Sequence, residues 1–186
     1  MKKDFNIVIV GTGGQGLITL LQITAEAALA SGFDVKTSEL HGLSQRGGSV
    51  EVHIRFGKKI YSPLVSQGGA DLIVALEMQE SLKATYFASP KTTFLINKHI
   101  VPIPLQKTLS KEQILGALEK ISKKIEVVEA SGVTAGVYLL SLASFKKLLP
   151  LKPQSILQAI KKVIPKQYLD LNLKTFELAR QNFKKN

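Results

Sequence analysis

The segment that most constrains the fold of this chain is a short apolar run followed by a cluster of glycines. Phe5–Val10 (FNIVIV) is rich in β-branched residues, which favours a strand buried on both faces. Gly11–Gly16 follows directly, and the apolar stretch Leu17–Ser31 then has the length of a helix, which Gly32 can end. A strand, a glycine turn and a helix in this order predict an α/β fold with a mostly parallel sheet.

Strands and helices alternate along the rest of the chain. Apolar runs predict further strands at Phe33–Leu40, Ala70–Leu76, Thr93–Ile96, Ile100–Ile103 and Glu126–Ala130. Predicted helices lie at Gln79–Ala88, after a capping box formed by Ser110 and Gln113, and at Thr134–Leu149, Pro153–Ile164 and Asp170–Phe183. The alternation predicts a three-layer, Rossmann-like sheet with helices on both faces. No linker or repeat interrupts it, so residues 1–186 are predicted to form a single domain.

One segment departs from the parallel pattern. Ser49–Phe56 alternates apolar and polar residues, which predicts a half-exposed strand, and His53 on its polar face is expected to be a surface or interface residue. Gly57 and Lys58 resemble a two-residue hairpin turn, and the chain is expected to return through Lys59–Ser62. The sequence therefore predicts an antiparallel hairpin at about residues 49–62.

Composition excludes several classes of site. The chain contains no cysteine, so it can form no disulfide, zinc–thiolate site or Cys-ligated iron–sulfur cluster, and this fits a reducing cytoplasm. The N-terminal residues lack the pattern of a signal peptide, and the apolar stretch Leu17–Ala30 is too short to cross a bilayer. We expect a cytoplasmic protein with no membrane partner.

The net charge of +11 is unevenly distributed along the chain. Residues 1–97 carry 9 Lys and Arg against 8 Asp and Glu, whereas residues 98–186 carry 16 against 6. A basic half of this kind can attract an acidic protein or nucleic acid, and a non-enzymatic nucleic-acid binder is therefore one hypothesis. Only three basic residues are arginines, and the aromatics are not interleaved with lysines, so a lysine-coated surface without nucleic acid is the favoured interpretation.

The glycine turn suggests a second hypothesis. Gly11-Thr12-Gly13-Gly14-Gln15-Gly16 has the G-x-G-x-x-G spacing, in which glycines let the backbone approach a pyrophosphate at a helix N-terminus. Glu39 ends the next predicted strand, where an acidic residue can bind a ribose hydroxyl. These features favour a free-standing NAD- or FAD-binding oxidoreductase. The alternative is that the glycines only allow strand, turn and helix to pack closely, and the doubled glycine before Gln15 is not the usual dinucleotide pattern.

A second glycine-rich segment decides between these interpretations. It is Ser38–Val50, SELHGLSQRGGSV. Together with VGTGGQG, it resembles the gamma-type subunit of the 2-oxoacid:ferredoxin oxidoreductases, and above all the small subunit of the indolepyruvate-type enzymes. The resemblance continues through Val52–Phe56 (VHIRF), Ala70–Glu77 (ADLIVALE) and Asn172–Glu177 (NLKTFE), so it covers essentially the whole chain. The pair GxGGQG and HGxxQRGG is specific, although neither half alone would be.

The resemblance implies a division of labour among subunits. In such enzymes thiamine diphosphate attacks the 2-oxoacid, carbon dioxide leaves, electrons pass through iron–sulfur clusters to ferredoxin, and coenzyme A takes the acyl group. This chain has no cysteine for a cluster and no Gly-Asp-Gly stretch to hold the diphosphate through Mg, so these cofactors are expected in larger partner subunits. The isolated chain is expected to be inactive, to meet ferredoxin only indirectly and to self-associate, as in a homodimer, through an exposed interface.

The substrate stays open at this stage. Relatives usually have a longer stretch, with an asparagine, before the helix that Ser131–Val137 enters directly here. The 2-oxoacid is therefore expected to be an aryl pyruvate such as indolepyruvate, pyruvate itself or another 2-oxoacid.

The candidate site lies where the strands end. Ligands of open α/β sheets bind at the carboxyl ends of parallel strands, so both glycine-rich segments are expected to face the partner's active centre or coenzyme A from that edge. The backbone amides of Gly13–Gly16 are predicted to form an anion-binding nest. The guanidinium of Arg46 is predicted to bind a phosphate or carboxylate through paired hydrogen bonds. The candidate cofactor-binding or active-centre-facing residues are Gly11, Gly13, Gly14, Gln15, Gly16, Glu39, His41, Gln45, Arg46, Gly47 and Gly48.

Structural roles compete with these assignments. His41 can be a structural hydrogen-bonding residue, and Gln45 with Arg46 can shape a subunit interface instead of contacting a ligand. Glu77 and Asn97 can cap helices after their strands. No residue is assigned a catalytic role, and no cluster of His, Asp and Glu predicts a metal site.

Overall fold

A computed structural model describes residues 4–42, 48–102 and 108–185. The strands are β1 (Phe5–Thr12), β2 (Asp34–His41), β3 (Ser49–Gly57), β4 (Leu72–Ala75), β5 (Thr93–Asn97) and β6 (Ile125–Val128). The helices are α1 (Leu17–Ala30), α2 (Glu80–Lys83), α3 (Lys111–Glu119), α4 (Ala135–Phe145), α5 (Pro153–Val163) and α6 (Lys166–Lys185), with a 3₁₀ turn η1 at Ala84–Phe87.

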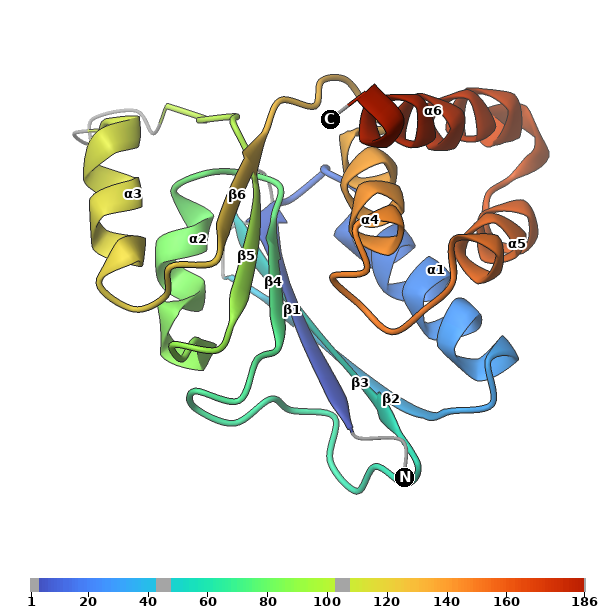
Figure 1. Cartoon of the computed structure of the whole chain (residues 1–186), viewed down its shortest axis with the longest axis horizontal. Coiled ribbons are helices and arrows are strands. Elements are labelled where there is room, and N and C mark those ends of the chain that lie inside the picture. The colour runs from blue at the N-terminus through green and yellow to red at the C-terminus, as the bar shows by residue number, and fades with distance from the viewer. Residues whose placement is uncertain (1–3, 43–47, 103–107, 186) are drawn as a thin grey trace.

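The strands form one sheet with the order β2-β3-β1-β4-β5-β6. Strands β1, β4, β5 and β6 pair in parallel, and β3 pairs antiparallel with both β1 and β2. Because β2 and β1 both run against β3, they run in the same direction. The carboxyl ends of all strands except β3 therefore lie at one edge of the sheet, the upper edge in Figure 1. We call it the carboxyl edge.

Helices cover both faces of the sheet, which confirms the predicted three-layer, Rossmann-like arrangement (Figure 1). Helices α1, α4, α5 and α6 lie on one face, where the core includes Ile7, Ile9 and Ile54. Helices α2 and α3 lie on the other face, where the core includes Val8 and Val10. Successive β1 residues thus enter opposite cores, as expected for a strand buried on both faces.

The predicted hairpin at residues 49–62 is wrong in its second half. The antiparallel strand exists as β3, but Lys59–Ser62 forms no strand. Both edges of β3 are already paired, one with β2 and the other with β1, so no edge is left for a returning strand. Instead the Ile60 amide donates to Asp34 Oδ2 at 2.7 Å, and the chain crosses the sheet to enter β4 beyond β1.

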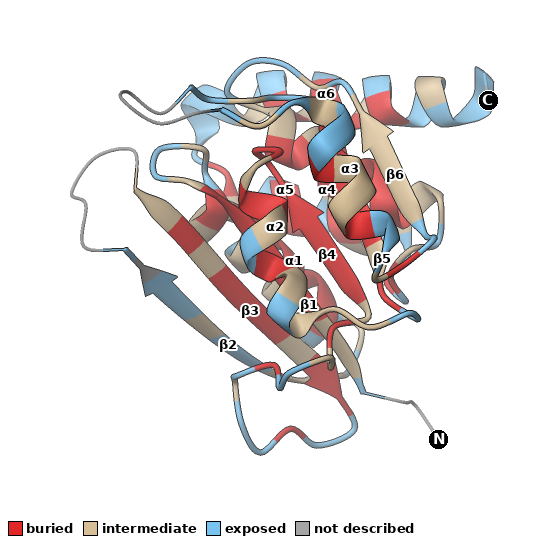
Figure 2. Ribbon diagram, turned by 90° about the vertical axis from the view of Figure 1, so that its left-hand side faces the viewer, coloured by how far each residue is buried: buried red, intermediate tan, exposed pale blue. Residues whose placement is uncertain are grey.

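The prediction that His53 is a surface or interface residue is also wrong. The segment that crosses the sheet between β3 and β4, which we call the crossing loop, covers the polar face of β3. The His53 side chain is therefore only 1% exposed. Its Nδ1 accepts a hydrogen bond from the Val65 amide at 2.9 Å, and its Nε2 lies 2.7 Å from Glu51 Oε1. The Arg55 guanidinium donates to the carbonyl oxygens of Ser62 and Leu64 on the same segment. Figure 2 shows β3 largely buried and β2 exposed beside it at the sheet edge.

Short sequence patterns predicted some elements correctly and others incorrectly. The capping box at the start of α3 is confirmed, because Ser110 Oγ accepts from the Gln113 amide while Gln113 Oε1 accepts from the Ser110 amide. Hydrogen bonds from its own backbone amide and from Ser110 lower the pKa of Glu112 in the first turn. The strand predicted at Ile100–Ile103 is absent from its described part, where the Val101 amide donates to Glu77 Oε1 instead of to a strand.

Candidate functional site

The first glycine turn is closed by its own glutamine. Gln15 Oε1 accepts the Thr12 amide at 2.8 Å, and the Gln15 amide donates to the Thr12 carbonyl oxygen at 3.2 Å. A Cβ on Gly11 would lie 2.5 Å from Gln15 Oε1 and 3.2 Å from Leu76 Cβ, just after β4, so the close packing of the turn favours glycine there. Gly16 caps α1 with a φ of 78°, a left-handed conformation that glycine adopts without strain.

The turn only partly fulfils the predicted anion nest. The Gly13 amide donates to the Gly48 carbonyl oxygen and the Gln15 amide to Thr12, so both are already bound within the protein. The Gly14 and Gly16 amides donate to no acceptor among the described residues. Both glycines are exposed, and a Cβ at either would meet nothing within 4 Å. Among the residues that the structure describes, the amides of the turn without an acceptor are therefore those of Gly14 and Gly16.

The structure brings the two glycine-rich segments together. The hydrogen bond from the Gly13 amide to the Gly48 carbonyl oxygen is 2.8 Å long and joins residues 35 positions apart in the sequence. The Gly42 amide donates to the Ser49 carbonyl oxygen at 2.9 Å, which closes the base of the second segment. Gln45, Arg46 and Gly47 lie outside the described residues, as does the His41 side chain, whose backbone pairs with Val50 in the sheet.

Glu39 lies away from the first glycine turn. It pairs with Val52 on β3, and Val52 pairs with Ile9 on β1. One strand thus separates Glu39 from β1, which places the two backbones roughly 10 Å apart at about 4.8 Å per strand. In a dinucleotide fold the acidic residue ends the strand directly beside the glycine strand. In this structure β3 therefore lies between Glu39 and the strand that leads into Gly11–Gly16, which differs from the usual dinucleotide arrangement.

Two buried side chains at the carboxyl edge hold loops in place. Asn97 Oδ1 accepts the Ala130 amide at 2.9 Å, which ties the end of β6 to β5. Glu77 Oε2 accepts the Glu80 amide at 2.8 Å and Oε1 accepts the Val101 amide at 3.0 Å. Glu77 therefore caps α2, as predicted, whereas Asn97 bonds to the backbone after β6 and not to a helix.

Sequence reasoning missed Glu80. Its carboxylate is 5% exposed, accepts a short hydrogen bond from Ser49 Oγ and lies 2.7 Å from Lys83 Nζ. Ser49 begins β3 and lies near the end of the second glycine-rich segment, so Glu80 anchors that end to α2. The spacing of Glu80 and Lys83 could have indicated their ion pair, but no sequence signal connects Ser49 with a residue 31 positions away.

The carboxyl edge is hollowed beside the glycine turn. One hollow of about 470 Å³ lies between the turn and the loop after β6, and its lining includes Gly14, Asn97 and Ser131. A second, of about 420 Å³, lies between the start of α1 and helix α6, and its lining includes Gly16, Val133 and Tyr168. Gln15, Val133 and Gly136 line both hollows. The edge predicted to receive a ligand or partner is thus concave.

Within residues 4–42, 48–102 and 108–185, no group of three or more His, Cys, Asp or Glu side chains is arranged to hold a metal ion. None of the helices in those ranges combines the length and apolar character needed to cross a membrane.

Comparison with known families identifies the chain. Residues 6–182 match the family described as Pyruvate ferredoxin/flavodoxin oxidoreductase. The chain belongs to this family. The resemblance inferred from the two glycine-rich segments is therefore confirmed.

Within the pyruvate ferredoxin/flavodoxin oxidoreductase family, relatives match along nearly the whole chain. The chain is 34% identical to the indolepyruvate oxidoreductase subunit IorB of Archaeoglobus fulgidus, over 93% of this chain and 92% of that protein. The identity to IorB of Thermococcus kodakarensis is 32%, over 95% and 94%. The common gamma subunit of the pyruvate/ketoisovalerate oxidoreductases of Pyrococcus furiosus is 32% identical, over 66% and 63%.

Solved structures share the fold of this chain. The keto/oxoacid ferredoxin oxidoreductase gamma subunit of Geobacter sulfurreducens aligns with a TM-score of 0.68 at 17% identity, over 98% of this chain and 99% of that chain. The 2-oxoglutarate:ferredoxin oxidoreductase of Magnetococcus marinus aligns with a TM-score of 0.71 at 18% identity, over 100% of this chain but only 32% of that chain. The chain is thus a small-subunit homologue of the 2-oxoacid:ferredoxin oxidoreductases.

Proposed function

We propose that this chain is the small, cluster-free subunit of a cytoplasmic, thiamine-diphosphate-dependent 2-oxoacid:ferredoxin oxidoreductase. The observation that carries the proposal is the match to the IorB subunits along nearly their whole length. These relatives are named for indolepyruvate, so an aryl pyruvate is the first substrate to test. The reaction would convert the 2-oxoacid and coenzyme A to acyl-CoA and carbon dioxide, with electrons passing to ferredoxin.

The cofactors of this reaction do not fit the chain itself. An iron–sulfur cluster needs cysteine ligands, and the sequence contains none. Thiamine diphosphate binds through a metal ion, and the sequence lacks the Gly-Asp-Gly stretch that would hold the diphosphate through one. The larger subunits would therefore carry the clusters, the thiamine diphosphate and its Mg, and this chain would act by shaping the site around them.

The carboxyl edge is the surface that we propose faces the partner's active centre. The open amides of Gly14 and Gly16, the hollow of about 470 Å³ and the joined ends of both glycine-rich segments all lie there. Exposed amides at a helix N-terminus can hold an anionic group, such as a phosphate of coenzyme A. Residues that would build and hold the glycine turn are Gly11, Gly13, Gln15 and Gly48. Residues that we predict to contact the partner's active centre or coenzyme A are His41, Gln45, Arg46 and Gly47.

Reconstitution tests the proposal directly. The chain is co-expressed with a candidate large subunit that carries a diphosphate-binding motif and Cys-x-x-Cys runs. The purified complex is assayed for coenzyme-A-dependent reduction of ferredoxin with indolepyruvate, phenylpyruvate, pyruvate and 2-oxoglutarate. We expect activity from the complex and none from either subunit alone. Turnover by the isolated chain, or a failure to associate with any thiamine-dependent, cluster-bearing protein, would contradict the proposal.

The dinucleotide hypothesis makes a separate prediction. Calorimetry of the isolated chain with NAD or FAD should show no binding, because β3 separates Glu39 from the glycine strand. Micromolar affinity for either dinucleotide would favour the free-standing oxidoreductase instead.

A further inference from the structure

The outer side of helix α6 is an exposed stripe that no other described element covers. Residues three and four positions apart share one side of a helix. The residues at this spacing along α6 are Gln167, Leu171, Lys174, Leu178, Gln181 and Lys185, and all of them are exposed. The opposite side is buried through Asn172, Thr175, Phe176 and Ala179. The orientation of the helix is therefore fixed by its inner side, and the outer stripe is free to contact another molecule.

The outer stripe carries more apolar surface than solvent exposure requires. Leu171 and Leu178 are each 48% exposed, and Tyr168, one turn before Leu171, is 54% exposed. Val133, in the loop before α4, is 90% exposed. We call Val133, Tyr168, Leu171 and Leu178 the α6 strip. Clusters of large, exposed apolar side chains often mark surfaces that bind another molecule.

The α6 strip is continuous with the carboxyl edge. Val133, Tyr168 and Leu171 line the hollow of about 420 Å³ whose far wall includes Gln15 and Gly16 of the first glycine turn. Figure 1 shows α6 lying across the end of the molecule where β6 ends. A molecule that covers the α6 strip would therefore also border the glycine turn.

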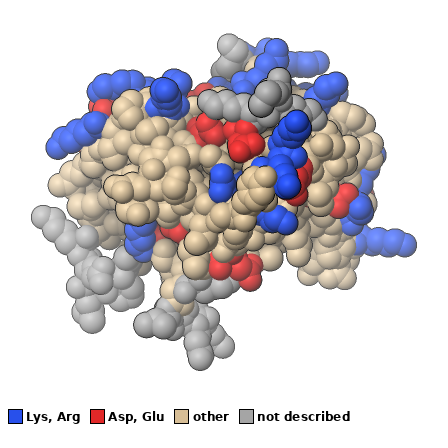
Figure 3. All heavy atoms as spheres, turned by 90° about the horizontal axis from the view of Figure 1, so that it is seen from below, with Lys and Arg blue, Asp and Glu red and all other residues tan. Residues whose placement is uncertain are grey.

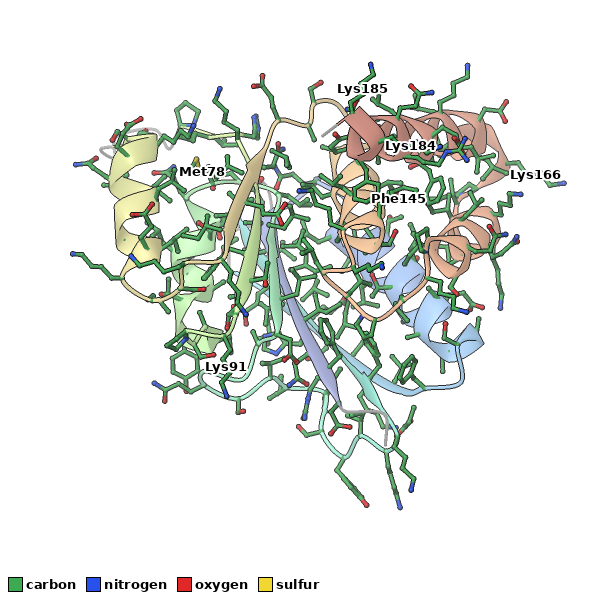
Figure 4. All side chains as sticks on the ribbon, viewed as in Figure 1. Met78, Lys91, Phe145, Lys166, Lys184 and Lys185 are labelled. Atoms are coloured by element: carbon green, nitrogen blue, oxygen red, sulfur yellow. The ribbon has the colours of Figure 1, made fainter. Side chains whose placement is uncertain are left out.

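The charges around the α6 strip have one predominant sign. Lys174 and Lys185 lie on the outer stripe, and Lys166 and Lys184 flank it near the two ends of the helix (Figure 4). None of these four lysines pairs with a carboxylate among the described residues. Of the two acidic residues in α6, Glu177 is bound by Arg180 at 2.7 Å, and Asp170 is the other. The view from the opposite, lower side shows acidic side chains interspersed with basic ones (Figure 3).

We propose that the α6 strip docks onto the larger partner subunit, at an apolar patch flanked by carboxylates. This inference rests on the proposed function and adds to it the face and the chemistry of the contact. The leucines would provide the buried anchors, while the lysines would meet the flanking carboxylates and guide association. A second copy of this chain fits less well, because a symmetric contact would bring the lysines of both copies together.

The anchors are tested with matched leucine variants. Leu171→Gln/Leu178→Gln removes the two anchors, and Leu29→Gln/Leu64→Gln removes leucines of similar exposure, 55% and 50%, elsewhere on the surface. Affinity for the large subunit is measured by biolayer interferometry, after circular dichroism has shown that each variant is folded. We expect a loss of roughly tenfold or more for the α6 variant and little change for the control.

The charges are tested with variants of equal net charge. Lys174→Glu/Lys185→Glu is compared with Lys120→Glu/Lys123→Glu, which reverses two exposed lysines near the end of α3. We expect the α6 variant to associate several-fold more slowly, with the difference shrinking as salt is raised, and the control to behave like the unmodified chain.

The outcomes distinguish the proposed docking face from the proposed function of the chain. Equal losses in both leucine pairs, or in both lysine pairs, would overturn the docking face while leaving the subunit assignment intact. Concentration-dependent dimerisation abolished by Leu171→Gln/Leu178→Gln, with unchanged binding to the large subunit, would assign the α6 strip to a second copy and also overturn the inference. If the unmodified chain does not bind the large subunit at all, the proposed function itself fails.

Discussion

The two faces of strand β3 carry different kinds of side chain. On the face under α1, α4, α5 and α6, the side chains of β3 that point inward are all apolar, namely Val50, Val52, Ile54 and Phe56. On the opposite face, the same strand presents Glu51, His53 and Arg55. His53 is hydrogen-bonded to Glu51 and to the crossing loop between β3 and β4, and Arg55 is hydrogen-bonded to that loop and to β1. The apolar face of β3 packs into the larger of the two cores, whereas its polar face ties a loop to the sheet.

This difference suggests separate tasks for the two faces. Burial of apolar surface stabilises the fold without specifying loop positions, since the hydrophobic effect is non-directional. Hydrogen bonds depend on direction, so His53 with Val65, and Glu80 with Ser49, determine where particular segments lie. Substitutions on the two faces should therefore change different measurable properties.

The largest effect is expected on the apolar face. Ile54→Ala should lower the free energy of unfolding by about 3 kcal/mol, because Ile54 is fully buried and its removal leaves a cavity. Urea denaturation followed by circular dichroism measures the change. Leu64→Ala, at a side chain 50% exposed, serves as control and should lose less than about 1 kcal/mol. Similar losses in the two variants would show that the face beneath α1 is not the main core.

A smaller but more local effect is expected on the polar face. His53→Leu leaves the buried Val65 amide without its acceptor and should cost about 2 kcal/mol. The distinguishing readout is hydrogen exchange, since the Val65 amide should lose protection while amides in β1 keep theirs. If protection falls evenly across the sheet, His53 acts through packing and not by tethering the loop.

The smallest effects are expected at two glycines, one at the start of α1 and one inside α3, which lie on opposite faces of the sheet. Gly16→Ala should destabilise by about 1.5 kcal/mol, because the φ of 78° at the start of α1 is unfavourable for alanine. Gly116→Ala, inside α3, should instead stabilise by roughly 0.5 to 1 kcal/mol, since a Cβ there meets nothing within 4 Å and alanine favours the helix. Thermal unfolding of both variants gives the signs. A stabilised Gly16→Ala would show that the turn adopts another conformation in solution.

Features that depend on neighbouring residues could be predicted from the sequence. The run FNIVIV, the glycine turn and the apolar helix after it were placed correctly, because strand and helix periodicity are properties of short segments. The capping box of Ser110 and Gln113 was predicted for the same reason. Family membership also followed from contiguous residues, since the two glycine-rich motifs can be recognised without knowing how the chain folds.

Tertiary structure alone decided which segments meet. The insertion of β3 between β1 and β2 depends on pairing between strands distant in the sequence, and no local pattern encodes it. That single choice separates Glu39 from the glycine turn, leaves no edge for a returning strand, and sends the next segment across the sheet, where it buries His53. The amino-acid order thus determined the elements and the family, while long-range backbone pairing determined which side chains are exposed and which share the carboxyl edge.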